Sequence, residues 1–208
     1  MRSLPDFATP LRENDADPDP FRQFAAWFSA AAEAGERAPE AAALATADRD
    51  GRPSARMVLV KQTGSDGFTF FTNYASRKGR ELTANPRAAL LFHWDRLGRQ
   101  VRVEGDVARL SSEESAAYVR TRPRGSQLSA LASRQSQPVP DREHLEERVR
   151  ELVARYADGE LPVPEFWGGF RLAADRVEFW QHREDRLHDR LLYVLGSGGE
   201  WHRERLAP

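Results

Sequence analysis

The chain has 208 residues, 32 acidic and 31 basic side chains, a formal net charge of −1 and no cysteine. This balance argues against a general nucleic-acid binder, and a chain without cysteine has no disulfide, thiolate nucleophile or thiolate metal site. No apolar run approaches the roughly 18 residues of a membrane-spanning helix, and the first ten residues, MRSLPDFATP, lack the apolar stretch of a secretory signal. We therefore expect a cytoplasmic protein, in which a local basic cluster could still bind a small anion.

Only two of the basic residues are lysines, Lys61 and Lys78. In a chain so rich in arginine, a remaining lysine is a candidate for a site that arginine cannot serve, because a compact ammonium fits where a planar guanidinium does not. Chance retention on a solvated surface is the alternative.

The chain begins with a segment rich in proline and aspartate, which predicts a flexible arm over residues 1–20 and a single domain over residues 21–208. From Phe21, apolar residues recur at three- and four-residue spacing through Ala31, which predicts an amphipathic helix that stops near Gly35.

The next seventy residues change to short apolar or alternating runs, which predict five strands near 41–47, 54–62, 68–73, 88–94 and 100–110. The sequences DRDGRP and TGSDG between them are typical of hairpin turns. One short helix interrupts the series over residues 76–86, with Ser76 as its N-cap and Pro86 at its end. Such closely spaced strands favour an antiparallel barrel over a doubly wound sheet.

The pattern from Ser112 to Asp158 is helical in three pieces, and Asp141 and Gly159 are expected to cap the last of them. Strands are then expected near 166–173, 176–181, 190–196 and 200–207. The fold class predicted is a β-barrel with peripheral helices, an α+β fold that is mainly antiparallel, in which the last strands close against the first.

Several familiar signals are missing from the sequence. GSGGE at residues 196–200 lies between two strand-like runs and predicts a hairpin turn rather than a dinucleotide-binding loop. The histidines lack the spacing of a zinc pair, so we expect no metal site, and there is no G-x-S-x-G elbow of a serine hydrolase.

Two clusters of basic and hydroxyl residues accompany the first strands. Arg56 and Lys61 are separated by an odd number of positions, so in a regular strand they face opposite sides, and only a bulge or a site around the strand edge would unite them. Ser76, Arg77 and Lys78 open a helix whose free N–H groups make an anion site. An ordinary helix cap with solvated charges is the alternative for this second cluster.

Two further clusters lie later in the chain. Tyr118 and Arg122 fall four apart on one helix face, and Ser126 is expected to start the next helix, so the three could share one phosphate. Arg186 and His188 alternate with Arg190 and are expected to project from one side of a strand, which is unfavourable unless an anion or acid meets them. Solvated helix ends and a solvated edge strand are the alternatives.

Together, eight ordered motifs resemble those of the pyridoxine/pyridoxamine 5′-phosphate oxidases, FMN enzymes of vitamin B6 metabolism. The resemblance runs from about Asp17 to Pro208. Its motifs are RMVLVK, FFTNYASRKGREL, RQVRVEG, RPRGSQ, SRQSQ, PEFWGGFRL, VEFWQHREDRLHDR and the closing RLAP. The resemblance implies an FMN-binding split β-barrel that forms a homodimer, with two FMN sites at the subunit interface lined by both chains.

The resemblance also implies roles for individual residues. The FMN phosphate and ribityl chain would be held by Arg56, Arg77, Lys78, Gln135 and Ser136, with Met57, Val58, Lys61 and Ser76 also in the cofactor site. The flavin ring would be positioned by Phe71, Thr72, Gln100, Trp180 and Arg190. The substrate phosphate would be bound by Lys61, Tyr118, Arg122 and Ser126. The catalytic pair beside the substrate's pyridine ring would be Arg186 and His188.

The reaction implied is oxidation of pyridoxine or pyridoxamine 5′-phosphate to pyridoxal 5′-phosphate, with dioxygen as acceptor and hydrogen peroxide as product. Because a flavin carries the difficult chemistry, the protein mainly orients its ligands, which explains why no nucleophile stands out. The alternatives are an FMN oxidase of the same fold that acts on another substrate, such as a phenazine precursor, and a carrier of flavin or pyridoxal phosphate without turnover.

Two departures from the family pattern stand out. Ser3 and Asp6 occupy the positions where the family usually has an arginine and a tyrosine that fold over the substrate, so an equivalent lid is an open question. Phe71 replaces a frequent tyrosine, which removes a hydroxyl near the flavin.

Overall fold

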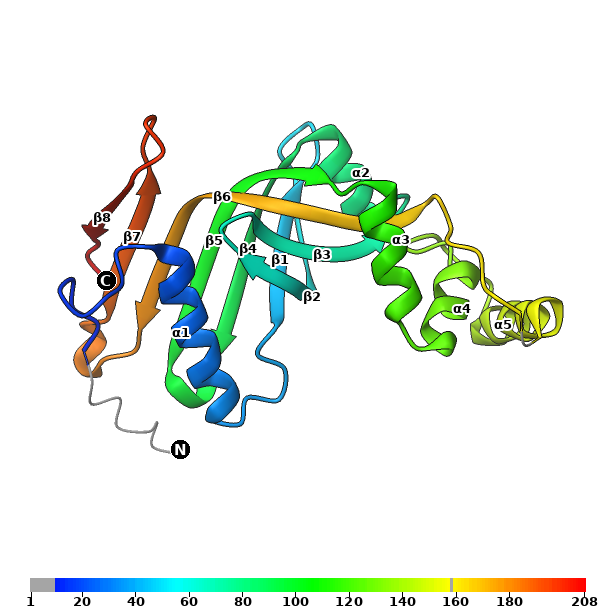
Figure 1. Ribbon diagram of the computed structural model, residues 1–208, viewed down its shortest axis with the longest axis horizontal. Helices are drawn as coiled ribbons and strands as arrows, with labels where there is room; N and C mark the ends of the chain where they lie inside the picture. The colour runs from blue at the N-terminus through cyan, green and yellow to red at the C-terminus, as the bar shows by residue number, and fades with distance from the viewer. Residues whose placement is uncertain (1–9, 158) are drawn as a thin grey trace.

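Eight antiparallel strands form one sheet that closes on itself (Figure 1). The structure is a computed structural model, and it describes residues 10–157 and 159–208. The strands are β1 (Ala41–Ala47), β2 (Pro53–Gly64), β3 (Gly67–Asn73), β4 (Arg87–Trp94), β5 (Arg99–Arg109), β6 (Trp167–Gln181), β7 (Asp189–Leu195) and β8 (Trp201–Arg205). Their order is β3-β2-β1-β4-β5-β6-β7-β8, and an additional β3–β6 pairing closes the first six into a barrel.

Over the described residues, five α-helices lie outside the barrel, and two short 3₁₀ turns connect β4 to β5 and β6 to β7. They are α1 (Pro20–Glu33), α2 (Arg77–Ala84), α3 (Ser112–Thr121), α4 (Arg124–Ala132), α5 (Arg142–Tyr156), η1 (Asp95–Leu97) and η2 (Glu184–Arg186). Helices α3 to α5 lie at one end of the molecule and the β7–β8 hairpin at the opposite end (Figure 1). The predicted barrel with peripheral helices is therefore confirmed.

Local signals in the sequence explain the ends of several elements. Asp19 caps α1 and accepts a hydrogen bond from the Phe21 amide, while Gly35 follows the helix with φ of +78°, a conformation that favours glycine. Ser76 caps α2 by accepting from the Gly79 amide at 3.3 Å, and Asp141 caps α5. The predicted hairpin turns between β1 and β2, β2 and β3, and β7 and β8 are all present.

The prediction of two strands over residues 166–181 was wrong, because β6 is one continuous strand of 15 residues. Glu104 of β5 pairs with Arg176 and Gly105 pairs with Ala174, so Asp175 is the extra residue of a β-bulge. The Asp175 carboxylate is paired with Arg87 of β4. The polar sequence AADR therefore bends the strand at a bulge and does not end it.

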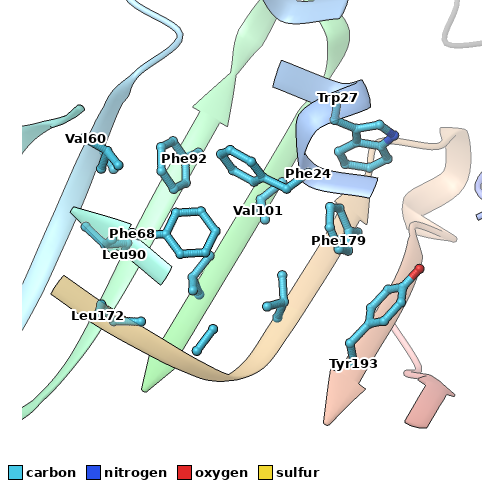
Figure 2. Close-up of a cluster of buried hydrophobic side chains, with 14 of the residues drawn as sticks. Phe24, Trp27, Val60, Phe68, Leu90, Phe92, Val101, Leu172, Phe179 and Tyr193 are labelled. Carbon is cyan, nitrogen blue, oxygen red and sulfur yellow. The ribbon is translucent and has the colours of Figure 1, made fainter. Parts of the chain in front are cut away.

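The core fills the barrel and continues under α1. Phe24 and Trp27 of α1 pack edge-on against the rings of Phe68, Phe92 and Phe179, with centroids 4.9–5.2 Å apart (Figure 2). These aromatic side chains are almost completely buried. Burial of this kind is the main stabilising contribution to the fold.

The segment before α1 is held against the β7–β8 hairpin. Leu11 and Ala16 join the core, and Arg205 of β8 binds the Glu13 carboxylate and the Leu11 carbonyl. Residues 1–9 of the predicted arm, including Ser3 and Asp6, lie outside the described residues. In the part of the chain that the structure describes, no helix is long and apolar enough to cross a membrane.

The bulge between β5 and β6 depends on a close backbone approach at Gly105. A Cβ atom there would lie 1.9 Å from the Ala173 carbonyl oxygen, whereas a Cβ at Gly64 of β2 would have no neighbour within 4 Å. We expect Gly105→Ala to lower the free energy of unfolding by about 2 kcal/mol or more. Denaturant unfolding of this variant beside Gly64→Ala checks the expectation, and equal effects of the two would contradict it.

Candidate functional site

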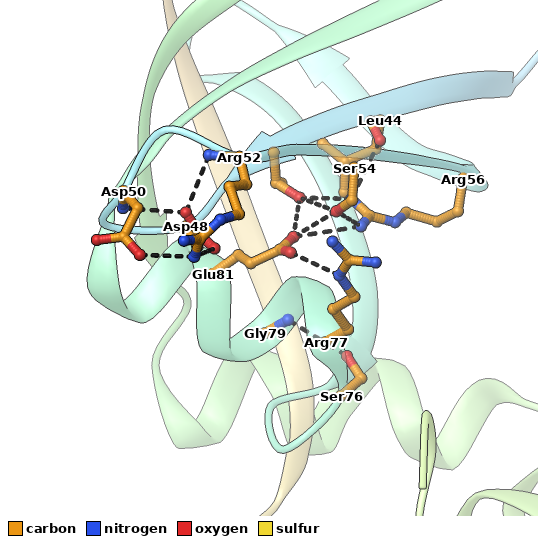
Figure 3. A network of polar contacts seen from close by, with 11 residues as sticks. Leu44, Asp48, Asp50, Arg52, Ser54, Arg56, Ser76, Arg77, Gly79 and Glu81 are labelled. Atoms are coloured by element: carbon orange, nitrogen blue, oxygen red, sulfur yellow. Dashed lines mark hydrogen bonds and ion pairs between the residues drawn. The ribbon is translucent and has the colours of Figure 1, made fainter. Parts of the chain in front are cut away.

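Three cations gather around the N-terminus of α2. Arg56 projects from β2, while Arg77 and Lys78 occupy the first turn of the helix that Ser76 caps. Glu81 lies between the two arginines, 3.3 Å from Arg56 Nη2 and 2.8 Å from Arg77 Nε (Figure 3). The sequence prediction of a cationic helix N-terminus is therefore confirmed as geometry, and Arg56 joins it from the neighbouring strand.

Glu81 is a buried carboxylate that organises this cluster. It accepts hydrogen bonds from Thr46 Oγ1 at 2.5 Å and Ser54 Oγ at 2.6 Å, besides the two ion pairs. Burial alone raises the pKa of Glu81, but the hydrogen bonds from Ser54, Thr46 and Arg77 outweigh it and hold the pKa at about 2. The side chain is therefore an anion that fixes the directions of the guanidinium groups.

Lys78 is buried, at 8% exposure, with no carboxylate in ion-pair distance among the described residues. Its Nζ donates to Thr72 Oγ1 at 3.2 Å and to Gln135 Oε1 at 3.3 Å. Burial, and then the charge of Arg56, lower the pKa of Lys78. An ammonium held only by neutral oxygens is an incomplete site, because a bound anion would offset its desolvation. Ser136, next to Gln135, has φ of +69° and lies in the left-handed region.

An aromatic stack lies beside this cluster. The rings of Phe71 on β3 and Tyr118 on α3 are nearly parallel with centroids 3.7 Å apart, and the ring of Trp167 is parallel to both at 6.0–6.2 Å. Arg122 places its guanidinium carbon 4.4 Å from the Trp167 centroid, and its Nη1 is buried without a hydrogen-bond partner among the described residues. Burial lowers the pKa of Arg122.

A cavity of about 370 Å³ opens next to the stack. Its walls include Arg122, Ser126, Gln135 and Trp167, so it joins residues from α4, β6 and the loop after α4. One expectation for this region needs correction. Arg122 is the C-cap of α3 and, as the four-residue spacing predicted, it interacts electrostatically with Tyr118. Helix α4 begins at Arg124, so Ser126 lies inside its first turn rather than at its start.

Lys61 lies at a bulge of β2. The pairing with β3 shifts register between Val60 and Gln62, so Lys61 is the extra residue, as one of the two predicted arrangements requires. Its Nζ lies 3.7 Å from Glu40 Oε1. On the same strand Val58 is half-buried and Met57 is 64% exposed.

A second group of predicted residues forms a row across β5, β6 and β7. Gln100 pairs in register with Trp180, and Trp180 pairs with Arg190. His188 packs on Trp180 with ring centroids 4.6 Å apart.

Arg186 and His188 do not alternate along a strand with Arg190, contrary to the prediction. Arg186 ends the 3₁₀ turn η2 with φ of +63°, Asp185 before it has φ of +53°, and β7 begins only at Asp189. The His188 ring folds back so that its Nδ1 accepts a hydrogen bond from the Arg183 amide at 3.1 Å. A turn rather than a strand edge therefore presents the two side chains.

These two groups lie far apart within one chain. Trp167 beside the stack and Trp180 of the row begin and nearly end β6, which at about 3.3 Å per residue separates them by roughly 40 Å along the strand. Around the barrel, β1 and β4 lie between β2 and β5. The predicted site residues therefore form two half-sites: the stack and cation cluster in one, and the row with its turn in the other.

Some residues of these half-sites escaped the sequence prediction. Trp167 had no predicted role of its own, although an aromatic residue next to the glycine pair in FWGGF could have marked it. The buried acids Glu81 and Glu178 could not be found from the sequence, because an acid in a chain rich in charge is usually solvated. Among the described residues no group of three or more His, Asp or Glu side chains is arranged to hold a metal ion.

The closed antiparallel barrel with its peripheral helices is that of a split-barrel protein. A family model described as pyridoxamine 5′-phosphate oxidase matches residues 28–156, and one described as the pyridoxine 5′-phosphate oxidase C-terminal dimerisation region matches residues 167–208. The chain belongs to the pyridoxamine 5′-phosphate oxidase family.

Individual relatives agree with this assignment. The chain is 59% identical over 198 residues to a pyridoxine/pyridoxamine 5′-phosphate oxidase of Rubrobacter xylanophilus, covering 95% of this chain and 91% of the relative. It is 54% identical to the enzyme of that name from Cupriavidus necator, covering 95% and 93%. Among solved structures it is similar to PhzG of Burkholderia lata in complex with tetrahydrophenazine-1-carboxylic acid, with a TM-score of 0.90, 35% identity and coverage of 97% and 98%.

The depressed pKa of Glu81 makes a prediction about stability. A carboxyl group whose pKa falls from 4.5 to about 2 on folding contributes stability above pH 4.5, and that contribution is lost as the pH falls through 2. We expect Glu81→Gln to lower the free energy of unfolding by about 3 kcal/mol at pH 7 and by much less near pH 2. Denaturant unfolding across this range checks it, with the exposed Glu147→Gln as control, and a deficit that does not change with pH would contradict it.

Proposed function

We propose that this protein oxidises pyridoxine 5′-phosphate and pyridoxamine 5′-phosphate to pyridoxal 5′-phosphate, using FMN and dioxygen and releasing hydrogen peroxide. The observation that carries the proposal is a pair of cations in neighbouring sites, the buried Lys78 and the half-buried Arg122 with its buried Nη1, neither of which has a carboxylate in ion-pair distance among the described residues. Two such sites suit two phosphate groups, one on the cofactor and one on the substrate.

The residues around α2 fit the phosphate of FMN. Arg56, Arg77 and Lys78 supply charge, the Ser76-capped helix start supplies amides, and Gln135 and Ser136 supply polar groups for the ribityl chain. Thr72 and Phe71 follow on β3 toward the ring, with Met57 and Val58 on β2. When bound, FMN supplies the acceptor for a hydride and the route of its electrons to dioxygen.

The substrate phosphate is assigned to Arg122, Tyr118, Ser126 and Lys61. Among the described residues the buried Nη1 of Arg122 has no hydrogen-bond partner, so it is available to a phosphate oxygen. The parallel rings of Tyr118 and Trp167 form an aromatic wall beside it. Lys61 lies at the β2 bulge, where its ion pair with Glu40 is long, at 3.7 Å, and partly exposed. A weak pair of this kind leaves its ammonium group able to bind the substrate phosphate. These residues would bind the phosphate, which does not react. By fixing that end of the substrate they would also fix the position of its 4′-carbon.

Arg186 and His188 are assigned to the reacting end of the substrate. Burial first, and then His182 and Arg186, lower the pKa of His188, which favours the neutral ring. Because Nδ1 of that ring accepts from the Arg183 amide, its proton is on Nε2, which is a donor. His188 thus offers a hydrogen bond, and Arg186 a positive charge, to the substrate's oxygen or nitrogen substituents.

The two half-sites support a homodimer in which each FMN site is lined by both copies. The row of Gln100, Trp180 and Arg190 is too far along β6 to meet the stack of its own chain, and a second copy would supply it. The outer face of β1, β2 and β4 exposes Met57, Leu59 and Leu91, an apolar surface suited to such a contact. The match of residues 167–208 to a dimerisation region is consistent with this arrangement.

The similarity to PhzG favours a second candidate, an FMN oxidase acting on a reduced phenazine precursor. The ligand named for PhzG carries a carboxylate, which could also pair with Arg122, but it has no phosphate for a second anion site. The more similar relatives carry the name of the vitamin B6 enzyme, and they support the first proposal. A cytoplasmic location stays a prediction from the sequence.

The central prediction concerns turnover. We expect the purified protein to be yellow with bound FMN, and pyridoxine 5′-phosphate with dioxygen to yield hydrogen peroxide together with a new aldehyde absorbance. Peroxide and absorbance measurements check this, with unphosphorylated pyridoxine as the control substrate. Colour without product would favour a carrier, and a colourless protein that takes up no FMN would exclude both functions.

The two lysines give a matched pair of variants. Because Lys61 is assigned to a group that does not react, Lys61→Arg should raise KM for the substrate several-fold, with kcat changed by less than about twofold and FMN retained. Because Lys78 is buried, Lys78→Arg should weaken FMN binding by about tenfold or more. Flavin fluorescence titration and steady-state kinetics distinguish them, and loss of flavin alone in both variants would contradict the assignment.

A further inference from the structure

A buried carboxylate lies directly behind the row of Gln100, Trp180 and Arg190. Glu178 precedes Trp180 by two residues on the same face of β6 and is only 5% exposed. Its Oε1 accepts from Arg190 Nε at 2.8 Å, and its Oε2 accepts from Arg102 Nη2 at 2.5 Å. A buried carboxylate is unfavourable unless its oxygens are satisfied, so the three side chains act as one unit.

The contact with Glu178 restricts the orientation of Arg190. The guanidinium is held at Nε by Glu178 and at Nη1 by the Ala207 carbonyl oxygen, 2.8 Å away. Among the described residues its Nη2 has no hydrogen-bond partner, and 26% of the side chain stays exposed. Since the guanidinium is planar, two fixed donors determine where the remaining ones point.

We propose that Glu178 is a positioning residue for flavin binding, which aims Arg190 at the polar edge of the flavin ring and offsets the positive charge of Arg102 and Arg190 there. The inference rests on the proposed function, in which the row of Gln100, Trp180 and Arg190 lines the FMN site, and on the family resemblance, which implies that Arg190 positions the flavin ring. Glu178 itself touches neither flavin nor substrate and acts through the guanidinium it holds.

Glu104 provides a matched comparison on the same face of the sheet. It pairs with Arg102 at 2.6 Å and with Arg176 at 3.7 Å, but it does not contact Arg190. If these ion pairs merely stabilised the sheet, neutralising either acid would affect the flavin equally. A positioning role requires that only Glu178 matter.

The test compares Glu178→Gln and Glu104→Gln with the unaltered full-length protein. Titration of flavin fluorescence gives Kd for FMN and for riboflavin, and dye equilibration gives the flavin midpoint potential. In Glu178→Gln, Arg190 is no longer held in place and its contact with the flavin ring is weakened, whereas contacts with the phosphate are unchanged. The Kd values for FMN and for riboflavin should therefore rise by a similar factor, on the order of tenfold. The midpoint potential of the flavin bound to Glu178→Gln should rise, because the variant lacks a negative charge that disfavours the reduced, anionic flavin. Glu104→Gln should leave both quantities nearly unchanged.

Each outcome decides between the two ideas. Equal behaviour of the two variants, or a loss confined to FMN, overturns the positioning role while the proposed function stands. Failure of the unaltered protein to bind either flavin overturns the proposed function and the inference with it.

If Glu178→Gln does not fold, Arg102→Gln carries the test. This variant removes a half-exposed positive partner and leaves Glu178 on Arg190. It should retain both flavins and lower the midpoint potential, because the remaining carboxylate is then less offset. An unchanged or raised potential contradicts the proposal.

Discussion

The pairing of β6 with β3 is the constraint on which the rest of the molecule depends. The first part of β6 pairs with β3, its last part pairs with β7, and β5 accompanies it on the other side for almost its whole length. One strand is therefore both the seam of the barrel and the base of the β7–β8 hairpin. The bulge at Asp175 separates these two parts, and each part carries its own half-site.

The charged residues follow one division of labour. Each of the two buried acids holds a pair of arginines: Glu81 holds Arg56 and Arg77, and Glu178 holds Arg102 and Arg190. Such buried pairs contribute little net stability, but they orient planar guanidinium groups. Lys78 and Arg122 have no carboxylate in ion-pair distance among the described residues, and both are expected to meet a ligand. A nearly neutral chain can thus still gather cations locally, as around the start of α2.

The sequence predicted those parts of the fold that local chemistry determines. The cap at Ser76, the stop at Gly35 and the hairpin turns follow from residues close in the chain, and the structure confirms them. The continuity of β6 and the turn at Arg186 depend on pairing and packing between distant segments. The local sequence pattern therefore predicted both wrongly, as two strands and as part of a strand. The candidate site came largely from the motif resemblance, which identifies residues but not the buried acids that orient them.

The two lysines show how much of a role lies in the surroundings rather than in the residue. Lys78 is buried and donates to neutral oxygens, so a compact ammonium head suits its surroundings better than a planar guanidinium. Lys61 is the extra residue of a bulge, is partly exposed and lies 3.7 Å from Glu40. The bulge, rather than burial, determines the direction of its side chain. The first arrangement favours a compact cation, whereas nothing in the surroundings of Lys61 separates lysine from arginine. The two lysines of this arginine-rich chain therefore lie in different physical surroundings, one buried and one partly exposed, which is why the proposed function gives them separate roles.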